Sequence, residues 1–224
     1  MRLHYHPAST TSRPVMLFVA ENKIPMETTV VDIFAGEQQR EPFASLNPSR
    51  MVPVLEDDGM VLTESSAILK YLADKIGSAA YPKELKERAC VNERMDWFNT
   101  NLYRDYGYGL VYPQSLPFLA YSDPVANKAC VERGLEKSKA WLAILDRSLL
   151  GPKRPYVCGE EITIADYLGA CMLEAGKLVN CSFATYPNVC HWLERMRALP
   201  NWGKVHEAFY GFAGSLKGKS FVAV

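Results

Sequence analysis

The stretch that decides the fold of this chain is Met51-Val52-Pro53-Val54-Leu55, together with Thr63-Glu64-Ser65-Ser66-Ala67-Ile68 downstream. A proline at the head of a buried strand cannot donate a hydrogen bond to the sheet. It can instead turn the amide and carbonyl of Val52 outward, especially as a cis peptide, so that an extended peptide could pair with them. Glu64 and Ser65 follow about one hairpin later, at a helix N-terminus that suits a carboxylate. The pattern predicts a site for a small peptide that carries both an ammonium and a carboxylate.

Working outward, residues 1–78 alternate strand and helix signals and are predicted to form one α/β domain. The order, βαβ followed by ββα, is typical of the thioredoxin-like fold. Glu56-Asp57-Asp58-Gly59 is a hairpin turn signal. The predicted elements are a strand at Arg2–His6, a helix at Thr11–Asn22, a buried parallel strand at Thr28–Ile33, a hairpin of Val52–Leu55 with Met60–Leu62, and a helix at Ser65–Lys75.

Strand signals nearly vanish after residue 78, and residues 86–224 are predicted to form an all-helical bundle domain. Asp123 and Pro124 open a helix whose apolar residues recur at helical spacing until Gly151. Thr163-x-x-Asp166 is an N-terminal capping box, which explains this pair without a catalytic role. The expected fold class is therefore α/β plus all-α.

Charge and cysteine content exclude several functions. The 25 lysines and arginines balance 25 acidic residues, so no net charge attracts nucleic acid or an anionic membrane. No apolar run approaches the roughly 18 residues of a membrane span, and the start lacks a secretory signal, so a cytoplasmic location is expected. The six cysteines form no C-x-x-C pair and no metal-ligand spacing, so we expect reduced thiols and no metal. The predicted thioredoxin-like half has no cysteine, which leaves glutaredoxin-type thiol exchange without a nucleophile.

Seven short fragments occur in a fixed order along nearly the whole chain: Tyr5-His6-Pro7-Ala8-Ser9, Gly36-Glu37-Gln38, Leu46-Asn47-Pro48, Val52-Pro53-Val54-Leu55, Glu64-Ser65, Ile164-Ala165-Asp166 and Tyr186-Pro187-Asn188. In this order and spacing they resemble the glutathione transferase family, and within it the theta-like, serine-type cytosolic class. The resemblance implies glutathione as co-substrate with no other cofactor, a small electrophile as second substrate, and a homodimer. Glutathione carries both the ammonium and the carboxylate that the sequence pattern predicts.

Such an enzyme must ionise the glutathione thiol. A free thiol of this kind has a pKa near 8.5, and lowering it by about two is worth roughly 2.7 kcal/mol. A hydroxyl donor at the turn after the first strand, beside a helix N-terminus, could supply this free energy. Five residues there carry hydroxyls: Tyr5, Ser9, Thr10, Thr11 and Ser12.

The resemblance favours Ser9 as the catalytic residue, because Pro7-Ala8-Ser9 followed by Arg13 matches the serine-type pattern. Tyr5 remains the alternative, since tyrosine-type members carry their activating residue near the end of this strand. Thr10 stands where a related bacterial class has a cysteine, so mixed-disulfide chemistry is not expected. Ser12 is interpreted as a helix cap.

The resemblance also implies the glutathione contacts: Val52 through its backbone, Pro53 by fixing that geometry, Glu64 to the γ-glutamyl ammonium, Ser65 to the adjoining carboxylate, and Gln38 to the glycyl end. An ordinary helix cap with a first-turn acid remains the alternative for Glu64 and Ser65. Many relatives have a lysine before the Val-Pro pair, where this chain has Met51. Arg50 and Arg40 are the candidates to replace that charge.

Aromatic residues cluster in the region that lines the electrophile site of the family: Tyr103, Tyr106, Tyr108, Tyr112 and Phe118. The substrate contacts expected from them, with Thr10, are Tyr103, Tyr106 and Tyr112; packing in the core is the alternative. Gly107 and Gly109 should weaken or kink the helix, and Phe209 and Phe212 could close the site from above.

The expected function is a detoxifying transferase that conjugates glutathione to small, hydrophobic electrophiles. Two alternatives stay open: a glutathione-dependent peroxidase or dehalogenase, and a non-catalytic module that binds ligands or proteins with the same fold.

Overall fold

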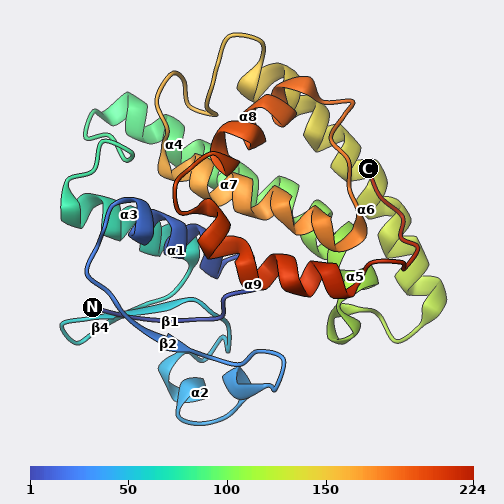
Figure 1. The fold of residues 1–224 in the computed structure, drawn as a ribbon, viewed down its shortest axis with the longest axis horizontal. Helices are drawn as coiled ribbons and strands as arrows, with labels where there is room; N and C mark the ends of the chain where they lie inside the picture. The colour runs from blue at the N-terminus through green and yellow to red at the C-terminus, as the bar shows by residue number, and fades with distance from the viewer.

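The computed structural model describes all residues, 1–224, and contains a small sheet with its helices below a larger helical part (Figure 1). The N-terminal elements are β1 (Arg2–Tyr5), α1 (Ser12–Glu21), β2 (Glu27–Val30), the 3-10 turn η1 (Glu37–Gln39), α2 (Phe43–Leu46), β3 (Val54–Asp57), β4 (Met60–Leu62) and α3 (Ser65–Ile76). This is the predicted order of βαβ followed by ββα, so the thioredoxin-like assignment is confirmed.

The sheet has the strand order β2-β1-β3-β4. Strand β1 runs parallel to β2 and antiparallel to β3, with Leu3 opposite both Thr28 and Leu55. Strand β4 closes the antiparallel hairpin with β3. The prediction for β2 was right in direction and wrong in burial: β2 is an edge strand, and all four of its residues are exposed.

Side chains alternate across the sheet, so its two faces meet different helices. Leu55 joins Leu3 in the main core, which extends into α1 and α3. Its neighbour Val54 joins a small cluster with Val52 and with Phe43 of α2. Helices α1 and α3 therefore cover the face toward the helical part, and α2 covers the opposite face (Figure 1).

Residues 77–84 connect α3 to the helical part without helix or strand. Its elements are α4 (Leu85–Trp97), the π-helical stretch η2 (Phe98–Val111), α5 (Tyr112–Ser115), η3 (Pro117–Leu119), α6 (Pro124–Ile144), η4 (Leu145–Leu150), α7 (Ile164–Glu174), η5 (Ala175–Val179), α8 (Pro187–Arg197) and α9 (Trp202–Ser215). The expected all-helical composition is confirmed. None of the helices is both long and apolar enough to cross a membrane.

Two glycines let η2 and α6 touch through their backbones. A Cβ added to Gly134 would lie 2.4 Å from the carbonyl carbon of Gly109, far inside van der Waals contact. The weakness expected at Gly107 and Gly109 takes the form of π-type winding that continues α4 rather than a break. Gly134 is therefore the packing requirement of this contact, while a Cβ on Gly109 would lie 3.2 Å from the Gly134 Cα.

The predicted capping box is present at the start of α7 and holds more than its own helix. The Asp166 carboxylate accepts hydrogen bonds through Oδ2 from the amide (2.8 Å) and hydroxyl (2.9 Å) of Thr163. Its Oδ1 accepts from the amide of Val157 and the indole of Trp192, both at 2.9 Å. Asp166 is completely buried and thus ties α7 to the preceding loop and to α8.

Helix α1 is the element that joins the two parts of the molecule. The Phe18 ring packs edge-on against Tyr167 of α7, with centroids 5.4 Å apart. The Glu21 carboxylate accepts from the amide of Asn201 at 2.7 Å, just before α9. Because α1 is held against α7 and α9, the turn that precedes it faces the helical part.

Candidate functional site

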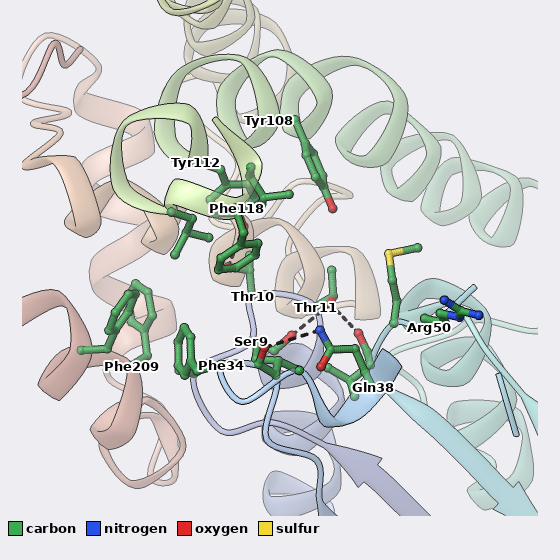
Figure 2. Close-up of a pocket in the computed structure, with 18 of the residues that line it drawn as sticks. Ser9, Thr10, Thr11, Phe34, Gln38, Arg50, Tyr108, Tyr112, Phe118 and Phe209 are labelled. Carbon is green, nitrogen blue, oxygen red and sulfur yellow. Dashed lines mark hydrogen bonds between the residues drawn. The ribbon is translucent and has the colours of Figure 1, made fainter. Parts of the chain in front are cut away.

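A cavity of about 590 Å³ lies between the two parts, at the turn between β1 and α1. This volume falls in the range of small-molecule sites. Fourteen of its 21 lining residues are hydrophobic, and none is acidic or histidine. Figure 2 shows Ser9, Thr10 and Thr11 with Tyr108, Tyr112 and Phe118 above them, Phe34 and Phe209 on one side, and Gln38 and Arg50 on the other. The cavity thus has an aromatic side and a polar side, with three hydroxyls between them.

The three hydroxyls of the turn are linked to the Val52 peptide. The Ser9 hydroxyl oxygen accepts from the Ser12 amide at 3.2 Å and lies 3.2 Å from the Thr11 hydroxyl. Thr11 donates to the Val52 carbonyl at 3.0 Å. Because a hydroxyl has one proton, Ser9 is the donor in its contact with Thr11. Ser9 is therefore a mostly buried donor at the N-terminus of α1, where the helix dipole favours an anion.

Of the five hydroxyl residues considered for thiol activation, Tyr5 and Ser12 do not line the cavity. The Tyr5 side chain borders a separate groove with Met16 and Val205. Ser12 is fully buried, and its hydroxyl accepts from the His6 amide at 3.5 Å. Ser9, Thr10 and Thr11 all line the cavity.

The peptide groups around Val52 are arranged for an extended ligand. The Val52–Pro53 peptide bond is cis, Val52 lines the cavity, and its amide donates no hydrogen bond within the protein. Its carbonyl accepts from Thr11 and has a second lone pair free. Pro53 does not line the cavity itself. An incoming backbone could therefore pair with both polar groups of Val52.

Gln38 lies on the polar side of the cavity. Its amide nitrogen donates to the Ile33 carbonyl at 3.4 Å, while its buried Oε1 has no partner. Arg50 and Met51 also line the cavity, whereas the Arg40 guanidinium donates to the Ala35 carbonyl away from it. Of the two arginines considered for the missing lysine, only Arg50 is in place.

Glu64 and Ser65 lie just outside the lining of the cavity, at the start of α3. Glu64 is exposed and has a φ of 65°, which a non-glycine residue adopts only when its surroundings impose it. Ser65 is the first residue of α3 and is buried. Burial and the negative charge of Glu64 raise the pKa of Tyr108, so this carboxylate is close enough to act on a residue of the aromatic side.

Tyr103 and Tyr112 line the cavity as expected, but Tyr106 does not. Tyr106 is fully buried, and its hydroxyl donates to the Leu173 carbonyl of α7 at 2.9 Å. Its ring packs toward Phe183, with centroids 6.3 Å apart, and so lies in the core of the helical part. The expectation that Tyr106 contacts substrate therefore fails on placement, and the alternative of core packing holds.

Other apolar lining residues come from distant segments. Phe118, Phe209 and Phe212 all line the cavity. Phe34 was missed: it belongs to the loop after β2, and its ring packs against Phe212 with centroids 5.0 Å apart. Leu178 of η5 was also missed. No local signal in the sequence marks either residue.

A second hydroxyl network reaches the cavity from the helical part. The Tyr103 and Tyr112 hydroxyls are 2.6 Å apart, and Tyr112 donates to the Thr10 hydroxyl at 2.8 Å. The Arg13 guanidinium also donates to Thr10, at 3.3 Å. Burial raises the pKa of Tyr112 to about 12, so its phenol keeps its proton at neutral pH.

Metal and thiol groups are not part of this site. The structure contains no group of three or more His, Cys, Asp or Glu side chains placed to hold a metal ion. All six cysteines are free, and none lines the cavity.

Comparison with known proteins gives matches over most of the chain. The family models for the glutathione S-transferase N-terminal and C-terminal domains match residues 8–75 and 113–200. Rat glutathione S-transferase theta-2 is 31% identical over 201 residues, covering 88% of this chain and 81% of its own. Human theta-2 solved with glutathione and an unknown ligand has a TM-score of 0.86 at 27% identity, covering 100% and 93%. A human theta-class enzyme solved with the glutathione conjugate of 1-menaphthyl sulfate has a TM-score of 0.85 at 29% identity, covering 96% and 88%.

Proposed function

Because the chain belongs to the glutathione S-transferase family and is a glutathione S-transferase, we propose that Ser9 activates the thiol of its bound glutathione. The observation that carries this assignment is the Ser9 hydroxyl in the cavity at the N-terminus of α1, linked through the Thr11 hydroxyl to the carbonyl of Val52. A hydrogen bond from Ser9 and the dipole of α1 both favour the thiolate over the thiol. The thiol proton leaves to solvent, because no carboxylate or imidazole lines the cavity.

The same proposal places glutathione along the polar side of the cavity. The cysteinyl backbone pairs with Val52, and the γ-glutamyl ammonium meets Glu64, whose exposed carboxylate is free to accept it. The γ-glutamyl carboxylate binds at Ser65, where α3 presents its N-terminus. At the glycyl end, the amide N–H donates to the buried Oε1 of Gln38, which lacks a partner, and the carboxylate meets Arg50, which supplies the positive charge that Met51 cannot.

The aromatic side of the cavity supports small, apolar electrophiles as second substrates. Phe34, Phe118 and Phe209 present rings to this space, and such walls favour flat apolar molecules over charged ones. Conjugation at an electrophilic carbon is the proposed reaction, with glutathione as the only co-substrate and with detoxification as its use. Peroxide reduction and dehalogenation use the same thiolate and are separated from conjugation by the substrate screen below.

The experiment is a pH titration of the protein with bound glutathione, followed by thiolate absorbance in the ultraviolet. We expect an apparent thiol pKa about two below the value near 8.5 of the free thiol. Ser9→Ala should raise it again and lower turnover at neutral pH about 10- to 100-fold, since a hydrogen bond to a charged group is worth about 1.5–3 kcal/mol. A Ser9→Ala protein with unchanged turnover would refute the role of Ser9. Tyr5→Phe is the matched control, because it removes a hydroxyl that does not reach the cavity.

The acceptor is identified with a panel of a chloronitroarene, an epoxide, an organic hydroperoxide and a dihaloalkane. Activity confined to the hydroperoxide or the dihaloalkane would contradict conjugation and favour the alternative reactions.

We also propose a homodimer in the cytoplasm. The dimer is supported by family membership and is tested by light scattering, where the mass should be twice that of one chain. Six free thiols suit a reducing compartment. A monomeric mass would refute the dimer.

A further inference from the structure

The Thr10 hydroxyl differs from its two neighbours in how its hydrogen bonds are distributed. A hydroxyl has one proton and two lone pairs. Thr10 accepts one hydrogen bond from Tyr112 at 2.8 Å and another from Arg13 at 3.3 Å, and it makes no other hydrogen bond. Both lone pairs are therefore used, and the proton has no acceptor. Since Thr10 lines the cavity, this proton is available to a ligand there.

The protons of the neighbouring hydroxyls are already committed. Ser9 donates to Thr11, and Thr11 donates to the Val52 carbonyl. Ser9 must give up its contact with Thr11 before it can donate to a ligand. Thr10 needs no such exchange, so it is the preorganised donor of the turn.

The groups behind Thr10 strengthen it as a donor. Because Tyr112 gives its proton to Thr10, Tyr103 must donate to Tyr112, and the three hydroxyls form one chain directed at the cavity. Successive hydrogen bonds of this kind polarise one another in a low dielectric. The chain ends in the proton that Thr10 does not use.

A buried positive charge adds to this effect. Arg13 is completely buried, its guanidinium lies 3.8 Å from the centroid of the Phe209 ring, and its Nε and Nη1 have no hydrogen-bond partner. Burial lowers the pKa of Arg13, but an arginine starts so high that it stays charged. Its Nη2 also donates to the Cys171 carbonyl at 3.4 Å, and the one carboxylate that favours its charged form, Glu174, is itself paired with Arg197. A buried positive charge of this kind favours an anion nearby, and the cavity beside Thr10 is the place where one would form.

We propose that Thr10 is a second hydroxyl donor to the sulfur of bound glutathione, beside Ser9, with Tyr112 and Arg13 as positioning residues. The inference rests on the proposed function and deepens it. Thr10 keeps its proton throughout: it stabilises the thiolate after the thiol proton has left to solvent, and no covalent bond to Thr10 forms. Figure 2 shows Thr10 between Ser9 and Tyr112, where the polar and aromatic sides of the cavity meet.

The test compares Thr10→Val, which keeps the shape and removes the hydroxyl, with Thr10→Ser, which keeps the hydroxyl. Thr10→Val should raise the apparent pKa of the bound thiol by about 0.5 to 1 and lower turnover at pH 6.5 about three- to tenfold. The loss of turnover should disappear near pH 9, where the thiol ionises without help. The dissociation constant of glutathione should stay within twofold, and Thr10→Ser should restore the parent pH profile.

A merely structural role for Thr10 would lower turnover equally at every pH and leave the thiol pKa unchanged. That result would overturn the proposal. Tyr112→Phe tests it without altering the turn, and remains informative if Thr10→Val does not fold. It removes one donor to Thr10, so it should shift the thiol pKa in the same direction by a smaller amount, and an unchanged pKa would count against the proposal.

Failure of this inference is distinguishable from failure of the proposed function. If the parent protein binds glutathione without lowering the thiol pKa, thiol activation itself is wrong. If the parent lowers it, Ser9→Ala raises it, and Thr10→Val leaves it at the parent value, then Ser9 acts alone and only the second donor is refuted.

Discussion

Asp166 offers a sharp test of how the helical part is held together. Replacing it with alanine removes a completely buried carboxylate that accepts four hydrogen bonds from three residues. Three of the donors cannot turn away: the amides of Val157 and Thr163 and the indole of Trp192. The fourth, the Thr163 hydroxyl, can rotate to find another acceptor.

The magnitude follows from counting the donors that stay fixed. A buried donor without an acceptor costs about 1–3 kcal/mol, so three of them in Asp166→Ala should lower the free energy of unfolding by about 4 kcal/mol. Asp166→Asn keeps one oxygen, which can stay with Val157 and Trp192, while its amide group faces Thr163. Only the Thr163 amide then loses its acceptor, and the expected loss is about 2 kcal/mol. Burial raises the pKa of Asp166, and replacing the carboxylate by a neutral amide offsets part of this loss.

The assay is urea unfolding at one fixed protein concentration, followed by far-UV circular dichroism because Trp192 is itself a partner of Asp166. Asp123→Ala is the matched control: Asp123 is exposed and accepts from the single amide of Val125 at 3.0 Å. It should lower the free energy of unfolding by about 1 kcal/mol or less. Equal losses for Asp166→Ala and Asp166→Asn would refute the count of fixed donors, and so would a loss in Asp166→Ala no larger than that of the control.

Two further stability predictions follow from buried positions. Gly134→Ala should lower the free energy of unfolding by about 2 kcal/mol in the same urea assay, because its Cβ would meet the backbone of Gly109. Gly211→Ala in α9, where the added Cβ meets open space, should raise the free energy of unfolding by about 0.5–1 kcal/mol. The opposite order of the two variants would contradict the packing argument. His206 is fully buried, and burial lowers its pKa from 6.5 to about 3. The unfolded state therefore binds a proton that the folded state refuses, so His206 destabilises the fold by about 1.4 kcal/mol per pH unit as the pH falls from 6.5 toward 3. His206→Gln should flatten the pH dependence of the free energy of unfolding between pH 6.5 and 4.5. His191 is exposed, so His191→Gln should leave this pH dependence unchanged. Equal slopes for the parent and His206→Gln would show that other groups cause the pH dependence.

Much of the fold could be predicted because the relevant signals are local. The hairpin turn at Glu56–Gly59 and the capping box at Thr163 depend on residues within a few positions of one another, and the structure has both. The burial of β2 could not be predicted in this way. A strand of threonine and valine has the composition of an interior strand, but β2 lies at the edge, and strand order is a property of the whole sheet.

The site residues likewise include some that a local motif predicts and others that only distant contacts place. Residues of the turn after β1 were expected from a motif, and Ser9, Thr10 and Thr11 do line the cavity. The sequence groups the aromatic residues but does not show which of them reach the cavity. Tyr103 lines the cavity and bonds to Tyr112, whereas Tyr106 bonds to Leu173 in the core, and these partners are 9 and 67 residues away along the chain. Phe34 has no signal at all, since its partner Phe212 is far along the chain.

By itself the sequence determined the family, the order of the elements and the identity of the turn whose hydroxyls line the cavity. These depend on spacing within short segments, where each residue's neighbours are known from the chain. Tertiary structure alone decided that Tyr5 faces a separate groove, and that the lone pairs of Thr10 are filled by Arg13 and by Tyr112, 102 residues away. A hydroxyl can act as donor or acceptor, and its role is set by whichever groups the packed chain brings within 3 Å or so of it.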